Sequence, residues 1–314
     1  MRKYFSIIIA LLIVALAAYF TLNNSNDAKK TTQRIIQITN PDIGTFGKQT
    51  HCGRPPKFLK QKGIPQPVLI DLSQKHHQGI ALLYGNSFKK TLHPKEWGRF
   101  EHFGTYALDR DGNIYLAPMP YISITPSTFL YQTNIYKLDS KNAELSVWMH
   151  LDNILPGANN PFGVISLVFD CDDQTLWVSA IDKSDYRTQK GRIYHIDIKS
   201  KSIIDTYDGF DALTLSLLHT NKGKYLLAGS ARDNGVYAFS IADKKLGKPI
   251  KLFSLPDANM HVRKIKVRGN STLELQAIPF TYTLIVQTDT EDRTYYNAVK
   301  NTNNASWVIK KIGT

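Results

Sequence analysis

Four acidic and amide residues recur at intervals of about fifty residues in this sequence, and their side chains could bind a metal ion. They are Glu101, Asn160, Asp211 and Asn259, separated by 59, 51 and 48 residues. Carboxylate and amide oxygens are hard ligands, which suit calcium. A divalent cation held by such ligands can polarise a carbonyl group for attack by water. Polar residues at loop tips are also expected without a metal, so the spacing alone assigns no ligand.

The same segments contain further polar and aromatic residues that could contact a ligand. The candidate ligand-binding residues are Glu101, His102, Tyr121, Asn159, Asn160, Asp211, Arg232, Asn259 and His261. Tyr121 lies in residues 118–132, the longest of the expected loops, and loops on a rigid scaffold often carry binding sites. The sequence contains no G-x-S-x-G, H-E-x-x-H, P-loop or C-x-x-C motif, so catalytic residues stay unassigned. A binding protein and an enzyme both remain open.

An internal repeat indicates which elements position these residues. Four copies of a strand-turn-strand pattern, each with an alanine at or near its end, span residues 102–117, 161–180, 209–229 and 260–277. A second hairpin follows each copy, and residues 67–92 show the same rhythm. Four strands in about 48 residues are typical of a β-propeller blade. In a propeller, loops that enter the innermost strands share one face, so we expect the candidate residues to meet at the mouth of a central channel.

The sequence therefore predicts an all-β fold, a β-propeller of four-stranded blades over residues 67–314. Residues 32–314 correspond to about six units of this length, so six blades are expected, with five as the alternative. Residues 33–38, "QRIIQI", could add a strand that pairs with the C-terminal "SWVIKKI" and closes the ring. Such closure removes exposed strand edges, which invite aggregation.

Two stretches in the middle of the chain resemble known propeller families. "DRDGNIYLA" and "PFGVISLVFDCDDQTLWVSA" are similar to blades of the NHL, SMP-30/gluconolactonase and royal-jelly/yellow families, over roughly residues 100–240. The resemblance implies six blades, and its alternative function is an SMP-30-like, metal-dependent lactonase or hydrolase. Those lactonases hold a divalent metal with Glu, Asn, Asn and Asp, so the resemblance implies Glu101, Asn160 and Asp211 as candidate metal ligands here. This chain departs from that order, and Pro161 follows Asn160 where the family usually has glycine.

The N-terminus predicts an apolar helix in a membrane. "MRK" precedes residues 4–22, which carry no charge, and a helix of this length covers about 28 Å, enough to span the hydrocarbon. Residues 1–22 are a signal anchor, or a signal peptide if cleavage follows the small residues at 15–17. The anchor places the protein in the cell inner membrane as a single-pass protein, with the propeller on the periplasmic or extracellular side. Cleavage would make it secreted.

The basic charge is concentrated outside the expected blades. Of the formal net charge of +13, residues 1–66 carry +8, residues 67–260 carry +1 and residues 261–314 carry +4. Residues 23–66 therefore read as a basic stalk that precedes the propeller. An export signal and the lack of RNP or zinc-finger motifs argue against nucleic acid. The expected partners are the membrane, through residues 4–22, and an unknown protein, peptide or small-molecule ligand. No cofactor is expected unless calcium binds.

Two cysteines, Cys52 and Cys171, are the only ones in the chain. In an oxidising compartment they could form a disulfide that ties the stalk to the folded body. The alternative is two unrelated thiols, because sequence alone does not show whether their Cα atoms come within bonding distance.

Overall fold

A computed structural model describes residues 35–36, 42–73, 77–120, 129–157, 159–283, 293–301 and 305–313. The chain separates into two compact units, Met1–Arg34 and Ile35–Thr314, and every described residue lies in the second. The apolar helix expected at residues 4–22, and also Tyr121, lie outside the described residues. Within the described ranges, no helix has the length and apolar character needed to cross a membrane.

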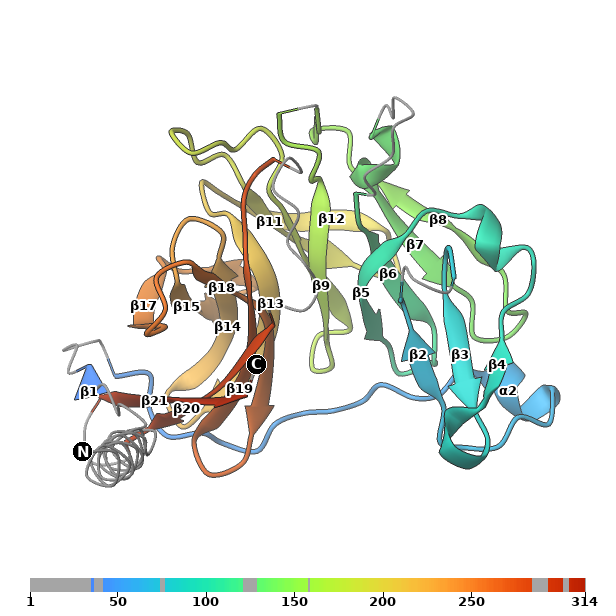
Figure 1. Ribbon diagram of the computed structural model, residues 1–314, viewed down its shortest axis with the longest axis horizontal. Coiled ribbons are helices and arrows are strands. Elements are labelled where there is room, and N and C mark those ends of the chain that lie inside the picture. Colours follow the sequence, from blue (N-terminus) through green and yellow to red (C-terminus); the bar gives the residue numbers. More distant parts are fainter. Residues whose placement is uncertain are drawn as a thin grey trace, which may run out of the picture. The chain divides into compact units, whose positions relative to one another are not determined.

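Five antiparallel sheets follow one another along the described chain (Figure 1). The first contains β2 (Leu69–Asp71), β3 (Ala81–Tyr84) and β4 (Lys90–Leu92), and the second β5 (Phe103–Leu108), β6 (Ile114–Pro118), β7 (Asn134–Leu138) and β8 (Leu145–His150). The third contains β9 (Val164–Asp170), β10 (Thr175–Ala180), β11 (Arg192–Asp197) and β12 (Ser202–Asp208). The fourth contains β13 (Ala212–Thr220), β14 (Gly223–Ser230) and β15 (Gly235–Ala242), with β16 (Lys245–Leu246) and β17 (Ile250–Ser254) both paired to β15. The fifth contains β18 (Met260–Arg268), β19 (Thr272–Pro279), β20 (Thr294–Lys300), β21 (Trp307–Gly313) and β1 (Ile35–Ile36).

Helical segments between these strands are short. They are α2 (Lys57–Gln61), η1 (Asn86–Phe88), η2 (Trp97–Arg99) and η3 (Leu130–Thr133). The strands follow from hydrophobic patterning: β10, "TLWVSA", is buried at every position, whereas the outer strand β12 of the same sheet has no buried residue. A short, continuous apolar run is typical of a strand that is covered on both faces. The all-β propeller predicted from the sequence is therefore present.

The described residues form five sheets, which agrees with the alternative of five blades, and six blades are not confirmed. Length was the main argument for six, but part of that length lies outside the blades. Residues 42–56 belong to none of the five sheets, and neither do the described residues of the connections between β6 and β7 and between β19 and β20. β1 belongs to the last sheet, where Ile35 pairs with Val308 and Ile36 with Trp307.

Apolar side chains fill the space between neighbouring sheets. Trp177 and Ile193 of the third sheet pack with Phe210, which precedes the fourth sheet, and with Phe239 in it. Trp177 also stacks on His195, with ring centroids 3.7 Å apart. Aromatic residues bury large areas and dominate core energetics. Each sheet is therefore held by its neighbours as well as by its own hydrogen bonds.

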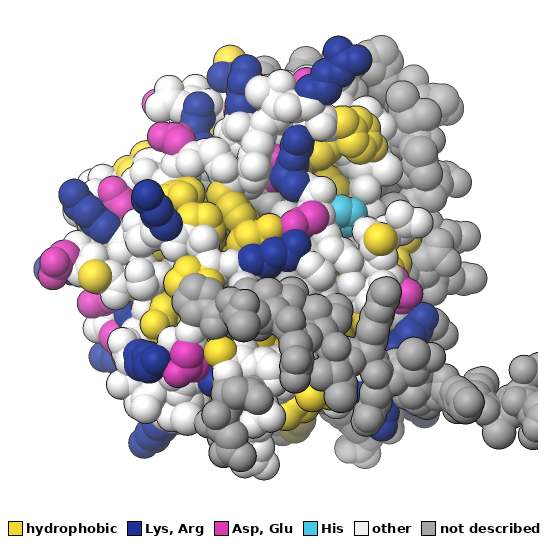
Figure 2. Space-filling model, turned by 90° about the vertical axis from the view of Figure 1, so that its left-hand side faces the viewer, with side chains coloured by type: hydrophobic (Ala, Val, Ile, Leu, Met, Phe, Trp, Pro, Cys, Tyr) yellow, Lys and Arg dark blue, Asp and Glu magenta, His cyan; other side chains and the backbone are white. Residues whose placement is uncertain are grey.

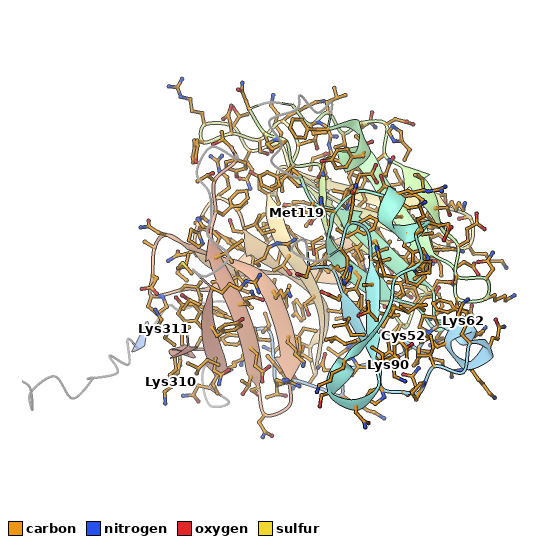
Figure 3. All side chains as sticks on the ribbon, turned by 45° about the vertical axis from the view of Figure 1, so that its right-hand side comes forward. Cys52, Lys62, Lys90, Met119, Lys310 and Lys311 are labelled. Atoms are coloured by element: carbon orange, nitrogen blue, oxygen red, sulfur yellow. A yellow bond between two sulfur atoms is a disulfide. The ribbon has the colours of Figure 1, made fainter. Side chains whose placement is uncertain are left out.

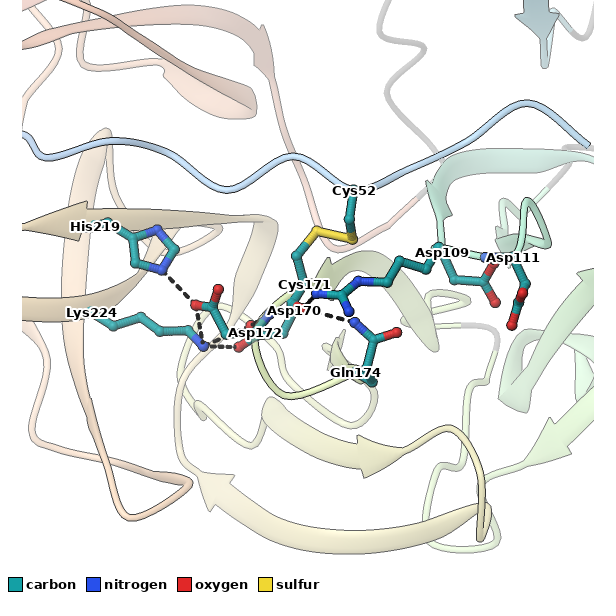
Figure 4. Close-up of a disulfide and its surroundings, with 10 residues drawn as sticks. Cys52, Asp109, Asp111, Asp170, Cys171, Asp172, Gln174, His219 and Lys224 are labelled. Carbon is teal, nitrogen blue, oxygen red and sulfur yellow. Dashed lines mark hydrogen bonds and ion pairs between the residues drawn. A yellow bond between two sulfur atoms is a disulfide. The ribbon is translucent and has the colours of Figure 1, made fainter.

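Residues 42–56, called the strap below, cross the three hairpins that connect β5 to β6, β9 to β10 and β13 to β14 (Figure 1). Gly47 donates a backbone hydrogen bond to His219, and Arg54 donates one to Asp109. Between them, Cys52 forms a disulfide with Cys171, with Cα atoms 5.7 Å apart (Figure 4). The part of the predicted stalk from residue 42 onward thus packs on the sheets.

Ionic contacts flank the disulfide on the hairpin between β9 and β10. Lys224 lies 2.6 Å from Asp170, 3.2 Å from Asp172 and 3.0 Å from Asp173 (Figure 4). His219 bonds Asp172 at 2.7 Å. The acidic residues of this hairpin are therefore matched by basic partners. Over the face shown in Figure 2, Lys and Arg side chains are dispersed and do not form one continuous patch.

Candidate ligand site at the mouth of the inner strands

Each of the four inner strands β5, β9, β13 and β18 carries a β-bulge near its first residue. In each case, one residue of the inner strand has no partner in the neighbouring strand. These residues are Gly104, Ile165, Leu213 and Arg263. A bulge bends its strand and re-aims the side chain of the extra residue, and bulges are common beside functional sites. The end of the inner strands that holds these four bulges is called the mouth below.

Arg263 connects three of the four bulges. Its Nη1 donates a hydrogen bond of 2.9 Å to the carbonyl of Leu213, and its Nη2 donates one of 3.4 Å to the carbonyl of Ile165. A Cβ added to Gly104 would lie 3.1 Å from Nη2, so the Arg263 guanidinium lies directly beside Gly104. The side chain of Arg263 thus lies among the inner strands, with 9% of the residue exposed.

The Arg263 charge has no acidic partner among the described residues. None of the ion pairs in the described ranges includes it. Burial lowers the pKa of Arg263 to about 10, so the guanidinium still carries its proton near neutral pH. Burying a charge without a counter-charge is costly. A cation held in this way is a candidate binding group for an anion.

Aromatic side chains from separate segments form a row at the mouth. Phe162 lies 5.4 Å from Phe280 between ring centroids, Phe280 lies 5.3 Å from Tyr282, and Tyr282 lies 5.7 Å from Tyr186. Phe162 and Tyr282 are buried, Phe280 is half-buried and Tyr186 is 65% exposed. These four residues, called the aromatic row below, thus lead from the interior to the surface. Apolar and aromatic walls of this kind are typical of ligand sites.

Two of the predicted site residues hold a loop at the mouth. Asp211 is fully buried and accepts hydrogen bonds from Ser184 (2.5 Å), the Gly191 amide (2.7 Å) and Tyr282 (2.6 Å). Asn160 donates to the carbonyls of Ile181 and Ser184 at 2.6 and 2.8 Å. Burial raises the pKa of Asp211. Both side chains therefore fix residues 181–191 onto the inner strands.

Arg232 fixes the outer part of the same loop. Its guanidinium donates to the carbonyls of Asp185, Tyr186 (3.1 Å) and Thr188 (3.4 Å). It also lies 5.8 Å from the centre of the Tyr282 ring, within the range of a cation–π contact. The structure thus brings Asn160, Asp211 and Arg232 together through a loop that all three of them hold.

Two of the three predicted metal ligands, Asn160 and Asp211, use their side-chain oxygens in hydrogen bonds. The Asn160 side-chain oxygen accepts the Phe162 amide at 3.0 Å, and both Asp211 oxygens are hydrogen-bonded. Glu101 accepts a hydrogen bond from Tyr136, and only its second oxygen is buried without a partner. Within the described ranges, no group of three His, Cys, Asp or Glu side chains could hold a metal. The side-chain oxygens of Asn160 and Asp211 are thus engaged in hydrogen bonds, and the metal site implied by the resemblance stays a prediction.

The other predicted residues are more dispersed. His261 has its Nδ1 3.3 Å from the Ser230 carbonyl and its ring 5.9 Å from Phe280, so it borders the aromatic row. Burial lowers the pKa of His261 and of half-buried His102. Asn159 and Asn259 are exposed in turns, and neither has a hydrogen bond in the described contacts that would link it to the row.

Sequence reasoning missed Arg263, Ser184 and the aromatic row. A signal for Arg263 was present in the aligned repeat copies, where "FGT", "VIS", "ALT" and "VRK" occupy the same place. Arginine stands there where the other copies have Gly104, Ile165 and Leu213. Ser184 and Tyr282 lie in connections that differ between copies, so the repeat carried no signal for them.

Comparison with known proteins shows only distant likenesses. No protein-family model matches the sequence, and no curated protein matches it. Similar solved structures include a glucose dehydrogenase (13% identity, 87% of this chain and 84% of that chain, TM-score 0.39) and a candidate gluconolactonase (13% identity, 87% and 91%, TM-score 0.43). Another is the Kuenenia stuttgartiensis hydrazine synthase (9% identity, 75% and 60%, TM-score 0.44). Likenesses this weak carry no argument about activity.

Proposed function

We propose that this chain is a ligand-binding propeller, held on the outer side of the cytoplasmic membrane. The aromatic row at the mouth carries this proposal. It combines a buried end at Phe162 with an exposed end at Tyr186, and the apolar part of a ligand could pack against its accessible rings. The loop that presents Tyr186 is fixed by Asp211 and Arg232, so the site is preorganised and little conformational entropy is lost on binding.

Binding is tested with a neutral aromatic probe, 3-phenylpropanol, on the full-length chain in lipid nanodiscs. Saturation-transfer NMR should show saturable binding above the level of empty nanodiscs. Phe280→Ala should weaken it by about tenfold, equivalent to roughly 1.4 kcal/mol. Phe88→Ala is the matched control, because Phe88 is 39% exposed and lies in η1 of the first sheet. Binding no stronger than to empty nanodiscs, or an equal loss in both variants, would contradict the proposal.

The hydrolase alternative makes a different prediction about metals. A cation that binds only the native state must raise the melting temperature. Because Asn160 and Asp211 are committed to hydrogen bonds, we expect calcium or zinc to leave the melting temperature unchanged relative to a sample with chelator. A rise that chelator reverses, and that Glu101→Gln abolishes, would restore the lactonase hypothesis.

The membrane location is supported by the sequence and by the disulfide. The uncharged residues 4–22 follow "MRK", and the bond between Cys52 and Cys171 suits an oxidising compartment. A maleimide–polyethylene glycol reagent, added to denatured and unreduced protein from cells, should label neither cysteine. Labelling of both cysteines would argue against export.

A further inference from the structure

One cationic side chain, that of Arg263, lies among the four bulges at the mouth. Arg263 belongs to β18, but its guanidinium reaches the bulges of β9 and β13 and lies beside Gly104 of β5. Its strand neighbours alternate between faces, whereas the bulge turns Arg263 toward the inner strands. The guanidinium is therefore held by backbone carbonyls of two neighbouring strands, β9 and β13.

Arg263 has hydrogen-bonding capacity beyond its two carbonyl contacts. A guanidinium carries five N–H donors in a planar fork. The described hydrogen bonds use one donor on Nη1 and one on Nη2. A carboxylate presents two oxygens that match such a fork, which makes arginine the usual residue for recognising this group.

The charges around Arg263 favour an anion. Burial lowers the pKa of Lys264, and the positive charges of Arg263 and Arg293 lower it further. Two carboxylates at this end of the strands already have partners. Asp211 accepts hydrogen bonds from Ser184 and Tyr282, and Asp233 accepts one from Lys251. Lys264 and Arg293 thus add positive charge near Arg263, while Glu101 and Asp182 at the same end of the strands each keep one buried oxygen without a hydrogen bond from a described residue.

The walls beside Arg263 are apolar. The carbonyls that it contacts belong to Ile165 and Leu213, which pack with Phe162 and Tyr282, and Met119 and Phe280 lie against the same cluster. The Met119 Sδ would lie 3.3 Å from a Cβ at Gly104, on the same side as Arg263. Figure 3 places Met119 well away from Cys52 and the strap, toward the opposite end of the sheets. The cation thus lies at the edge of an apolar cluster.

We propose that Arg263 binds the carboxylate of a small organic acid at the mouth, while the apolar part of that acid packs against Phe162, Phe280 and Met119. This inference rests on the proposed binding function and names its ligand class. The competing explanation is structural: Arg263 would only satisfy the carbonyls of Ile165 and Leu213, and no ligand would depend on its charge.

The test compares two probes of matched shape, 3-phenylpropionate and 3-phenylpropanol, on the full-length chain in lipid nanodiscs. At neutral pH the acid should bind at least about tenfold more tightly than the alcohol, as expected for a charge-assisted bidentate contact. Arg263→Gln should reduce this preference to about twofold or less and leave the affinity for the alcohol nearly unchanged. Arg268→Gln is the control, because Arg268 lies at the other end of β18 and pairs with Glu274; it should keep the full preference.

Arg263→Lys provides a second variant if Arg263→Gln does not fold. It keeps the charge but loses the fork, so the preference for the acid should fall without disappearing. Equal binding of both probes to the unaltered chain overturns the carboxylate assignment but leaves the proposed function standing. Binding of neither probe overturns both. If Arg263→Gln lowers the melting temperature but keeps the preference for the acid, Arg263 only stabilises the fold and the proposal is overturned.

Discussion

Replacing Cys52 and Cys171 together by alanine should lower the free energy of unfolding by about 3 to 5 kcal/mol. The two cysteines are 119 residues apart in the sequence. Closing a loop of that length removes conformational entropy from the unfolded chain equivalent to about 5 kcal/mol. The value is an upper limit, because residual structure in the unfolded chain reduces the effect.

The strap should remain in place without the disulfide, because hydrogen bonds also hold it. Gln49 donates to the His219 carbonyl at 2.9 Å and accepts from the His219 amide at 2.9 Å. The stability loss should therefore come from the unfolded state, and urea unfolding should show a larger m-value in the double variant, because its unfolded chain exposes more surface. Native-state spectra should change little.

Gln49→Ala is the control for this experiment. It removes strap contacts but keeps the disulfide, so its cost should be about 1 to 2 kcal/mol with an unchanged m-value. If the double variant loses less than about 1 kcal/mol, or loses no more than Gln49→Ala, the loop-closure reasoning is refuted.

Two further predictions concern buried polar groups. Asp211→Ala leaves Ser184, the Gly191 amide and Tyr282 without their acceptor, so urea unfolding should show a loss of about 3 kcal/mol or more; Asp211→Asn, which keeps one acceptor, should lose less, and equal losses would contradict this account. Burial lowers the pKa of His195 below its ordinary 6.5, so the unfolded chain binds this proton more tightly and stability should fall as the pH drops below that value. The urea midpoint should therefore fall between about pH 7.5 and pH 5, and His195→Gln should make this fall smaller. An equal fall in the variant would contradict a role of His195 in the pH dependence.

The repeat made the sheets predictable from the sequence. Residues 102–117, 161–180, 209–229 and 260–277 coincide, within two residues at the C-terminal end, with the strand pairs β5–β6, β9–β10, β13–β14 and β18–β19. Apolar runs broken by polar turns are a local signal, and four copies make it stronger. The number of sheets was less predictable, because length alone does not separate a blade from the strap or from a long connection.

The mouth was only partly predictable, for reasons of backbone geometry. Asn160, Asp211 and Arg232 do lie at one end of the inner strands, but their bonds to the loop at 181–191 depend on three-dimensional proximity. Arg263 was overlooked because "HVRKIKVR" reads as an alternating basic strand. The bulge shifts that alternation by one residue, and no local sequence rule places a bulge at this position.

The central claim is that the mouth holds an acidic, partly apolar ligand, and a crystal structure of the chain soaked with 3-phenylpropionate tests it most directly. The account predicts a carboxylate within about 3 Å of the Arg263 guanidinium and a phenyl ring against Phe162 and Phe280. A probe found only at the strap, or inner strands that stay free of it at saturating concentration, would contradict the claim.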